Sequence, residues 1–361
     1  MNVIPPGSAI GILGGGQLGR MIALAAARLG YNCHVFSSEK DAPALQVTSA
    51  HTIGSFTDEI ALAKFASSVD VITLEWENVP ISTLEYLASK VPVYPSADVQ
   101  RIAQDRLLEK SFARDNEIGT TDFAAINSAD DLKTALNNFS RPAILKSTRM
   151  GYDGKGQVKI ESGTEAADAW RSMGAGQGIL EAFVDFDREV SVIVARRSDG
   201  ETAAYPVVEN IHRNHILDKT IAPAPIDKAI AEEAAQLALK LASALKVVGL
   251  LAVEMFILKK PNAKGQRVLM NEIAPRPHNS GHWTIDACSC SQYEQLVRAI
   301  CGLPLGSTTP HSKAIMQNLI GDDILGTDKF LKDPSACLHL YGKTEIRPTR
   351  KMGHVTFLSE T

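Results

Sequence analysis

The chain has 361 residues, 45 % of them hydrophobic, which is enough for two or three domains of ordinary globular composition. Its formal net charge of -4 excludes a broad basic surface, so nothing at this level indicates nucleic acid or an anionic membrane as a partner. Any anion-binding site must therefore be local.

The N-terminal segment and the cysteines predict a cytoplasmic protein. Residues 1–10, MNVIPPGSAI, lack the basic start and long apolar run of a signal peptide. The most apolar stretch, residues 234–258, is interrupted by Lys240, Lys246 and Glu254, which argues against a membrane span of ~20 apolar residues. The five cysteines include no C-x-x-C pair and are typical of reduced thiols.

The first hundred residues predict a parallel βαβ domain. Residues 8–13 have the pattern of a buried strand, residues 14–30 that of a glycine turn and an amphipathic helix, and residues 32–36 that of a second strand. A later strand, residues 69–75, ends in an acid. The pattern closes near residue 97, where we place the first domain boundary.

A second domain is expected from residue 98 to residue 300. Residues 98–117 have helical spacing, with an Asp suited to an N-cap, and residues 226–246 are the clearest helix of the chain, with one apolar face. Short β-branched segments between these helices predict an antiparallel sheet, and two more strands follow the second helix. The predicted strands are 141–148, 156–160, 177–183, 188–197, 202–210, 249–258 and 266–274.

The first glycine turn fits the dinucleotide-binding fingerprint. Gly14, Gly16 and Gly19 have the G-x-G-x-x-G spacing between a strand and a helix. The second strand, however, runs into residues 36–38 without an acid for the ribose hydroxyls, and Glu39 arrives late. Because such a turn can bind any phosphate, a nicotinamide-dependent oxidoreductase is one alternative rather than a conclusion.

A second glycine-rich loop, residues 147–157 (STRMGYDGKGQ), suits an anionic ligand. Gly151 and Gly156 have P-loop spacing, but Gln157 stands where that motif requires lysine. What remains is a backbone rich in N–H donors beside two cationic side chains. The alternative is a surface hairpin turn, since the loop contains an Asp-Gly dipeptide.

Two acids lie in apolar strands that are close in sequence. Glu254 and Glu272, with Asn271 beside the second, supply the hard oxygen ligands that Mg²⁺ takes when it bridges nucleotide phosphates. Burying either carboxylate unpaired would cost several kcal/mol. The alternative is that both acids point outward from alternating strands.

A dense polar segment, residues 274–284 (APRPHNSGHWT), follows the second acidic strand. Its prolines keep it irregular, and such a loop is a better place for binding residues than for packing. The spacing of His278 and His282 hints at zinc, but the helix and glutamate of a metalloprotease are missing. Anion contact by Arg276, assisted by His278, is the better interpretation.

In chain order, these pieces resemble one family. The segments GGGQLGRM, LEWENVP, LKSTRMGYDGKGQ, EAFVDFDREVSVIVAR, VEMF, NEIAPRPHNSGHWT and RPTRKMGHVT resemble those of the N5-carboxyaminoimidazole ribonucleotide synthetases, ATP-grasp enzymes of purine biosynthesis. The resemblance implies a fold of α/β and α+β class. It comprises a parallel pre-ATP-grasp domain (1–97), an ATP-grasp domain (98–300, lid subdomain about 120–185) with ATP between two antiparallel sheets, and a small β-rich C-terminal cap (301–361).

The resemblance implies ATP and Mg²⁺ as cofactors. Glu254 and Glu272 would bind the metal, while the second glycine loop would close over the phosphates. The implied ATP-contacting residues are Arg106, Lys146, Gly151, Tyr152, Asp153, Gly154, Lys155, Gly156, Gln157, Glu181, Ala182, Phe183, Val184, Glu189, His212, Asn271 and Glu272.

The implied reaction carboxylates 5-aminoimidazole ribonucleotide with bicarbonate and ATP. It passes through carboxyphosphate, whose fragility in water gives a physical reason for a closing loop. Arg276 and His278 would bind bicarbonate, with Tyr152 and Glu75 near the amine. The implied substrate contacts are Gln17, Leu18, Asp153, Asn279, Ser280, Arg350 and Lys351, the last two gripping the 5′-phosphate.

The same resemblance suggests a cytoplasmic homodimer. Besides the oxidoreductase, two alternatives remain at this point. One is a formate-dependent glycinamide ribonucleotide transformylase of the same fold, and the other is a binding protein that has lost catalysis.

Overall fold

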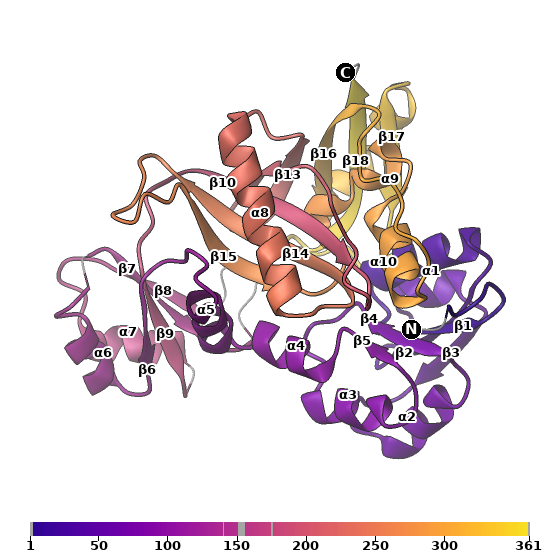
Figure 1. Ribbon diagram of the computed structural model, residues 1–361, viewed down its shortest axis with the longest axis horizontal. Coiled ribbons are helices and arrows are strands. Elements are labelled where there is room, and N and C mark those ends of the chain that lie inside the picture. The colour runs from indigo at the N-terminus through magenta and orange to yellow at the C-terminus, as the bar shows by residue number, and fades with distance from the viewer. Residues whose placement is uncertain (1–2, 140, 151–155, 175, 360–361) are drawn as a thin grey trace.

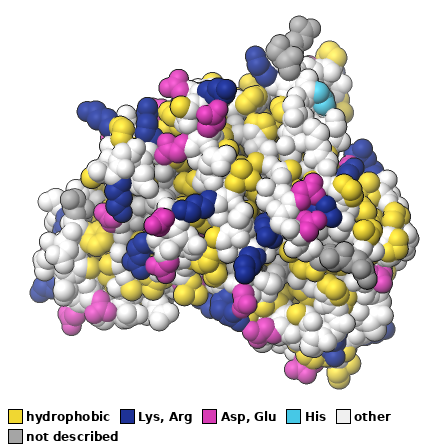
Figure 2. Space-filling model, in the orientation of Figure 1, with side chains coloured by type: hydrophobic (Ala, Val, Ile, Leu, Met, Phe, Trp, Pro, Cys, Tyr) yellow, Lys and Arg dark blue, Asp and Glu magenta, His cyan; other side chains and the backbone are white. Residues whose placement is uncertain are grey.

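The computed structural model describes residues 3–139, 141–150, 156–174 and 176–359, and within these ranges the strands form three sheets (Figure 1). The N-terminal sheet has the order β3-β2-β1-β4-β5, the small sheet β6-β9-β7-β8, and the central sheet β15-β14-β10-β12-β13-β16-β18-β17 with β11 paired to β10. None of the helices in these ranges is long and apolar enough to cross a membrane. Figure 2 shows cationic and acidic side chains interspersed on the displayed face, in keeping with the small net charge.

The N-terminal sheet is parallel, as the sequence predicts. Its middle strands are buried on both faces because helices cover both sides: Ile10 and Ile12 pack with α1, whereas Ile72 and Leu74 pack with α2 and α3. The elements are β1 (Ala9–Leu13), α1 (Gln17–Arg28), β2 (Asn32–Ser37), η1 (Pro43–Val47), β3 (Ala50–Ile53), α2 (Glu59–Ala66), β4 (Val71–Leu74), α3 (Ile81–Ala88) and β5 (Val93–Tyr94).

The expected helix over residues 98–117 is in fact two helices, α4 (Ala97–Ala103) and α5 (Arg106–Asp115). Gln104 leaves the helix and donates to two backbone carbonyls of the loop after β4. Asp105 then starts a new helix, since its carboxylate accepts from the N–H groups of Leu107 and Leu108 at 3.0 and 3.2 Å. The break turns α5 toward β15, which it contacts.

The small sheet carries the second glycine loop on its β7–β8 hairpin, as predicted, with Lys146 opposite Gln157. Residues 151–155 lie outside the described residues. Helices α6 and α7 pack against the sheet. The elements are β6 (Phe123–Ile126), α6 (Ala129–Ala135), β7 (Ala143–Ser147), β8 (Gln157–Ile160), α7 (Ala166–Met173) and β9 (Gly178–Ala182).

The central sheet takes the later predicted strands, so the single antiparallel sheet expected over residues 141–210 is wrong. β10 pairs with β14 along almost its whole length and thereby leaves the small sheet. The segment 202–210, expected as one strand, is interrupted at Pro206, which has no N–H to donate to a ladder. The elements are β10 (Phe186–Arg196), β11 (Thr202–Ala204), β12 (Val208–Arg213), β13 (Ile216–Ala222), α8 (Lys228–Ala244), β14 (Gly249–Leu258) and β15 (Val268–Ala274).

The C-terminal part is rich in strands, as expected, and these strands extend the central sheet. A helix in this part, α10, packs against α1, so the N-terminal sheet and the central sheet are joined through one core (Figure 1). The elements are η2 (Asn279–Gly281), α9 (Thr284–Ala287), α10 (Gln292–Ile300), β16 (Lys313–Ile320), η3 (Gly321–Gly326), α11 (Asp328–Leu331), β17 (Ala336–Leu340) and β18 (Lys351–Ser359).

Candidate active site

Two acids face each other across neighbouring strands. β14 and β15 pair as predicted, with Glu254 directly opposite Glu272. Leu251, Val253 and the other odd-numbered residues of β14 pack toward α8, so strand alternation turns Glu254 to the opposite face. The Glu254 side chain is 17 % exposed and that of Glu272 is 44 % exposed. Both carboxylates thus share one face that a ligand can reach.

The two carboxylates differ in their pKa values. Burial alone would raise the pKa of Glu254, but the hydrogen bond and charge of His278, helped by His212 and Lys351, lower it to about 2. Burial raises the pKa of Glu272, and the neighbouring Glu254 charge raises it further, against the opposing effect of Arg106. Two neighbouring carboxylates repel each other when both are ionised. A divalent cation bound between Glu254 and Glu272 would relieve that repulsion.

Cationic side chains lie opposite this acid pair. Arg106, the first residue of α5, lies 3.5 Å from the Glu272 carboxylate through Nη2. On β7 of the small sheet, the Nζ of Lys146 donates to Glu181 on β9 at 2.8 Å. Arg106, Lys146 and Glu272, three of the predicted ATP-site residues, are therefore brought together from three separate elements.

Two charged residues of this cluster, Glu109 and Lys110, escaped the sequence analysis. Both are buried on α5, and Lys110 donates to Thr120 Oγ1 at 3.1 Å and to the carbonyl oxygen of Asn271 at 3.0 Å. Burial lowers the pKa of Lys110, whereas burial and the Glu272 charge raise that of Glu109 to about 8. The signal for them was the spacing of Arg106, Glu109 and Lys110, which places three charged residues on the same face of one helix as the buried Ala113.

The opposite end of the cluster contains the residues predicted at adenine and ribose. Glu181 is 4 % exposed, and its Oε1 has no hydrogen-bond partner among the described residues. Although burial alone would raise it, Lys110 and Lys146 lower the pKa of Glu181, so it is an ionised acceptor. Glu189 Oε2 lies 3.0 Å from His212 Nδ1. Ala182 ends β9, and Phe183, which is half exposed, lies beneath the ammonium group of Lys159.

The polar loop after β15 contacts the acids directly. The Arg276 guanidinium pairs with Glu77 at 2.9 Å. His278 uses both ring nitrogens, Nε2 at 2.9 Å from Glu254 and Nδ1 at 2.9 Å from Ser280 Oγ. Of the remaining predicted residues on this loop, Asn279 has a buried side-chain amide with no partner among the described residues.

The first glycine turn holds a carboxylate of its own chain. Glu75, at the end of β4, accepts a hydrogen bond from the Gly16 N–H at 2.9 Å. A Cβ at Gly14 or Gly16 would lie within 3 Å of this carboxylate, so the turn closes around it. Burial raises the pKa of Glu75, while the Gly16 hydrogen bond and Arg276 oppose that rise. The space that a dinucleotide pyrophosphate would take is filled, which argues against the oxidoreductase alternative.

The two residues predicted to bind the 5′-phosphate, Arg350 and Lys351, lie where the segment after β17 enters β18. Lys351 begins β18, and Arg350 precedes it. Lys343, which no sequence motif singles out, donates through Nζ to the Lys351 carbonyl oxygen at 2.6 Å. Gln46 of η1 donates to the Gly342 carbonyl oxygen at 2.7 Å and accepts from Arg20 of α1 at 2.8 Å, so this segment is docked on the N-terminal part beside η1 and α1. The side chain of the predicted Leu18 is buried in the core, so only its backbone can face a ligand.

A separate histidine cluster lies among α9, β17 and β18. Donor atoms of Asp286, His339 and His354 lie within 4.8 Å of one another. His339 already pairs with Asp286 at 3.0 Å, and its ring stacks on His354 at 4.5 Å with only 15° between the planes. In stacked rings, the nitrogen lone pairs point in parallel directions and do not converge on one metal ion. We therefore interpret these three residues as hydrogen-bonded packing and not as a metal site.

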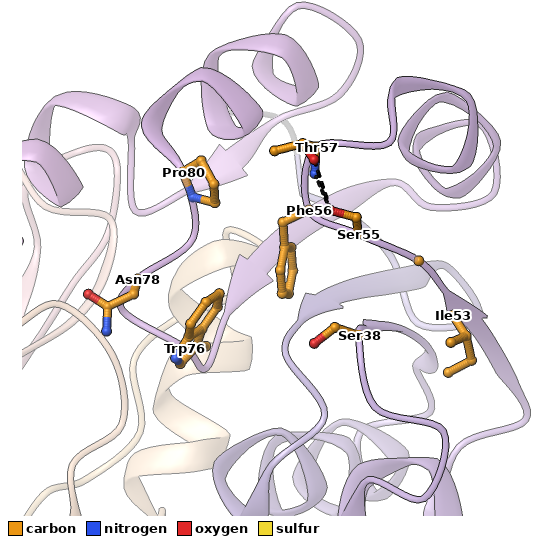
Figure 3. A pocket seen from close by; sticks show the side chains of 9 residues that line it. Ser38, Ile53, Ser55, Phe56, Thr57, Trp76, Asn78 and Pro80 are labelled. Atoms are coloured by element: carbon orange, nitrogen blue, oxygen red, sulfur yellow. Dashed lines mark hydrogen bonds between the residues drawn. The ribbon is translucent and has the colours of Figure 1, made fainter. Parts of the chain in front are cut away.

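An open hollow of about 520 Å³ lies at the carboxyl ends of β2, β3 and β4 (Figure 3). Phe56 and Trp76 meet there with ring centroids 5.2 Å apart. None of the titratable residues described above lines it. Its neighbours in sequence, Glu75 and Glu77, point instead toward the glycine turn and Arg276.

Family models match most of the chain. One described as an ATP-grasp domain matches residues 111–293. One described as a ribonucleotide synthetase preATP-grasp domain matches residues 8–104, and one described as a phosphoribosylaminoimidazole carboxylase C-terminal domain matches residues 314–361.

Curated relatives match nearly the whole of this chain. An N5-carboxyaminoimidazole ribonucleotide synthase from Brucella melitensis is 46 % identical over 355 residues, with 98 % of this chain and 97 % of that protein covered. The bifunctional purine synthesis protein purC/E of Dictyostelium discoideum is 47 % identical over 372 residues. That match takes in 98 % of this chain but only 37 % of the Dictyostelium protein.

Solved structures show the same fold with ligands. The ADP complex of an N5-carboxyaminoimidazole ribonucleotide synthetase superimposes with a TM-score of 0.95 at 41 % identity, covering 100 % of this chain and 95 % of that one. The Aspergillus clavatus N5-carboxyaminoimidazole synthase in complex with ADP and 5-aminoimidazole ribonucleotide superimposes with a TM-score of 0.89 at 32 % identity, covering 98 % and 94 %.

Proposed function

The chain belongs to the N5-carboxyaminoimidazole ribonucleotide synthase family of ATP-grasp ligases, and we propose that it uses ATP and bicarbonate to carboxylate the exocyclic amine of 5-aminoimidazole ribonucleotide. The products are N5-carboxyaminoimidazole ribonucleotide, ADP and phosphate. The step belongs to purine biosynthesis, and carboxyphosphate is the intermediate that carries the carboxyl group.

The observation that carries this proposal is the acid pair opposite the cationic cluster. Glu254 and Glu272 share one face of the central sheet, while Lys146 approaches from the small sheet and Arg106 from α5. An arrangement of two carboxylates and two cations suits a nucleotide polyphosphate with its metal ion. The filled glycine turn removes the competing dinucleotide site.

Glu254 and Glu272, with Asn271 alongside, fit Mg²⁺ because they offer hard oxygen donors of net negative charge. Bound there, the ion would supply charge that neutralises the transferring phosphoryl group. Arg106 and Lys146 hold the phosphates. Glu181 to Val184, with Glu189 and His212, hold adenine and ribose.

The second glycine loop covers the phosphates in this proposal. Its member Gln157 begins β8 opposite Lys146, and Gly156 directly precedes that strand. The other members, Gly151, Tyr152, Asp153, Gly154 and Lys155, lie outside the described residues. A cover over the reaction excludes water, which would otherwise hydrolyse carboxyphosphate.

Arg276 and His278 bind bicarbonate and the carboxyl group derived from it, and Glu75 with Tyr152 lies near the amine. The proximity of Arg276 to the glycine turn supports this, since the charge of Arg276 acts on the pKa of Glu75. The ribonucleotide contacts Gln17, Leu18, Asp153, Asn279 and Ser280. Arg350 and Lys351 hold its 5′-phosphate.

The division into domains 1–97, 98–300 (lid subdomain about 120–185) and 301–361 is part of the same proposal. So are the homodimeric state and the cytoplasmic location, which family membership supports.

The decisive experiment measures ADP release with and without 5-aminoimidazole ribonucleotide, together with transfer of label from ¹⁴C-bicarbonate into the product. We expect ADP release to depend on the ribonucleotide and label to appear in it. Formate and glycinamide ribonucleotide serve as the matched alternative pair. Turnover with that pair, and none with bicarbonate, would overturn the assignment in favour of a transformylase.

A further inference from the structure

We infer that Ser191, Asn210 and Thr220, three polar residues in the centre of the central sheet, are positioning residues that hold the His278 proton on Nε2 and thereby orient the carboxylate of Glu254. This inference rests on the proposed function, in which Glu254 is a magnesium ligand. It concerns residues behind the site, none of which contacts ATP or substrate in that proposal.

The residues form one continuous chain of hydrogen bonds. Thr220 Oγ1 is 3.2 Å from Asn210 Oδ1, and Asn210 Nδ2 is 2.9 Å from Ser191 Oγ. Ser191 Oγ is 2.7 Å from Ser280 Oγ, and Ser280 Oγ is 2.9 Å from His278 Nδ1. The chain ends where His278 Nε2 lies 2.9 Å from Glu254 Oε1.

The donor and acceptor of each hydrogen bond near His278 follow from two groups whose roles are fixed, the Glu254 carboxylate and the Ser280 backbone N–H. An ionised carboxylate only accepts, so His278 Nε2 must carry a proton toward Glu254. The Ser280 backbone N–H, which only donates, is 3.4 Å from His278 Nδ1, so that nitrogen is an acceptor. The Ser280 hydroxyl therefore donates to Nδ1 and accepts from Ser191.

The far end of the chain agrees with this direction. Since Ser191 donates its proton to Ser280, its oxygen must accept from the next residue, and Asn210 presents its donor group Nδ2 there. The Asn210 carbonyl oxygen then accepts from Thr220. Each hydroxyl and the amide have one geometrically possible role, so the chain has a single polarity.

Burial gives this polarity its strength. Ser191, Thr220 and Ser280 are each 0 % exposed and Asn210 is 6 % exposed, so bulk water cannot replace a broken bond. Ser191 also interrupts the apolar run of β10, where a hydroxyl without partners would be unfavourable. A chain of this kind explains why three polar residues are retained in the core.

The consequence for the metal site is orientation. Because the Nε2 proton engages Glu254 Oε1, the other oxygen of this carboxylate is left for a cation. Partners that orient a ligand in this way are worth about 10- to 100-fold in metal affinity or activity. The chain thus connects the interior of the sheet to one of the two acids.

The first test reads the tautomer directly. In protein labelled with ¹⁵N-histidine, long-range ¹H–¹⁵N spectra distinguish Nε2–H from Nδ1–H, and His278→Gln identifies the signal. We expect Nε2–H in the wild-type chain. In Asn210→Asp, measured at a pH at which the new carboxyl group is ionised, the side chain can only accept, so both serine hydroxyls must reverse and Nδ1 must become protonated. An Nδ1–H signal in the wild type, or an unchanged tautomer in Asn210→Asp, would overturn the inference.

The second test measures the Mg²⁺ concentration that gives half-maximal activity. We expect Ser191→Ala and Asn210→Asp to raise it by about 10- to 100-fold. The matched control is Thr356→Val, which removes an equally buried hydroxyl of the same sheet that has no partner among the described residues, and it should stay within about twofold of wild type. Unchanged Mg²⁺ dependence in both Ser191→Ala and Asn210→Asp would contradict the orienting role.

The two tests separate this inference from the proposed function. The wild-type tautomer is measured without substrate, and the only variant it requires is His278→Gln, which assigns the signal. If Glu254→Gln left the Mg²⁺ dependence unchanged, the metal role of Glu254 would fail even where the tautomer was as expected. If ADP release and label transfer behaved as proposed while the tautomer did not, the inference alone would fail.

Discussion

At the scale of single residues, the candidate site is built from charged side chains in positions where burial makes the ionised form energetically unfavourable. Glu254 and Glu272 could be predicted from the sequence because each interrupts an apolar strand. Glu109 and Lys110 could not be singled out, since charged residues on a helix usually face solvent. Only the packing of α5 against β15 shows that these two point inward.

Glu272→Gln tests the metal role. The substitution keeps the shape of the side chain but removes the negative charge opposite Glu254, so kcat with Mg²⁺ and ATP should fall by about 100-fold or more. Steady-state ADP release measures the loss, and far-ultraviolet circular dichroism should show an intact fold. Glu232→Gln, at an exposed acid on α8, is the control. Activity close to wild type in Glu272→Gln would refute the role.

Lys110→Met tests whether the buried lysine supports the fold as well as the site. The change leaves Thr120 and the Asn271 carbonyl without their donor and removes a cation 3.7 Å from Glu181. Breaking a buried pair costs about 3–5 kcal/mol, so the free energy of unfolding in urea should drop by roughly that amount. Lys240→Met, at a half-exposed lysine, should change it by less than about 1 kcal/mol. Equal effects of the two substitutions would show that Lys110 has no special role.

At the scale of elements, local pattern predicted most helices and strands but missed the breaks between them. The helix over residues 98–117 divides because Gln104 donates to backbone carbonyls outside it and the Asp105 carboxylate caps the start of a new helix. Nothing in the local sequence pattern marks the boundary between the small sheet and the central sheet, since β9 and β10 both read as apolar strands. Their separation follows from the pairing of β10 with β14, a contact between distant parts of the chain.

The segment between β17 and β18 predicts a pH dependence. Burial, with the charges of Arg350 and Lys351, lowers the pKa of Lys343 to about 8, despite the opposing effect of Glu75. Lys343 is therefore charged below pH 8 in the folded protein and loses its charge as the pH rises through that value. A positive charge on Lys343, beside Arg350 and Lys351, favours binding of the 5′-phosphate of the ribonucleotide. We therefore expect kcat/KM for 5-aminoimidazole ribonucleotide to decline between pH 7 and 9.5.

Lys343→Arg is the matched variant for this profile, since arginine stays protonated throughout that range and should remove the decline above pH 8. Stability should move in the opposite sense. Between pH 8 and 10.5 the unfolded lysine holds its proton while the folded one has lost it, so the contribution of Lys343 to the free energy of unfolding rises with pH. The same kcat/KM profile in both proteins would contradict the assignment.

At the scale of the whole molecule, the site is assembled from parts far apart in the chain. The α/β class, the parallel N-terminal sheet and the ATP-grasp family could all be predicted from motifs and their order. The way α10 packs on α1, and the way the last strands extend the central sheet, could not, because such contacts leave no local pattern.

Ligand-dependent stability tests this assembly as a unit. ADP with Mg²⁺ at about 100 times its Kd should raise the free energy of unfolding by about 2.7 kcal/mol, because it binds the folded chain alone. NADH at the same concentration should leave it unchanged, since Glu75 fills the first glycine turn. Thermal unfolding followed by calorimetry measures both. Stabilisation by NADH without stabilisation by ADP would contradict the arrangement.

The carboxylate of Glu75 inside the first glycine turn determines which ligand this βαβ unit can bind. In dinucleotide-binding proteins, a turn of this shape binds the diphosphate of the cofactor. In this chain, the carboxylate of Glu75 occupies that position. In the proposed function, ATP therefore lies elsewhere, between the acid pair of the central sheet and the cations of α5 and the small sheet. Removing that one acid would not by itself create a dinucleotide site, because the second strand still ends without the residue that would recognise a ribose.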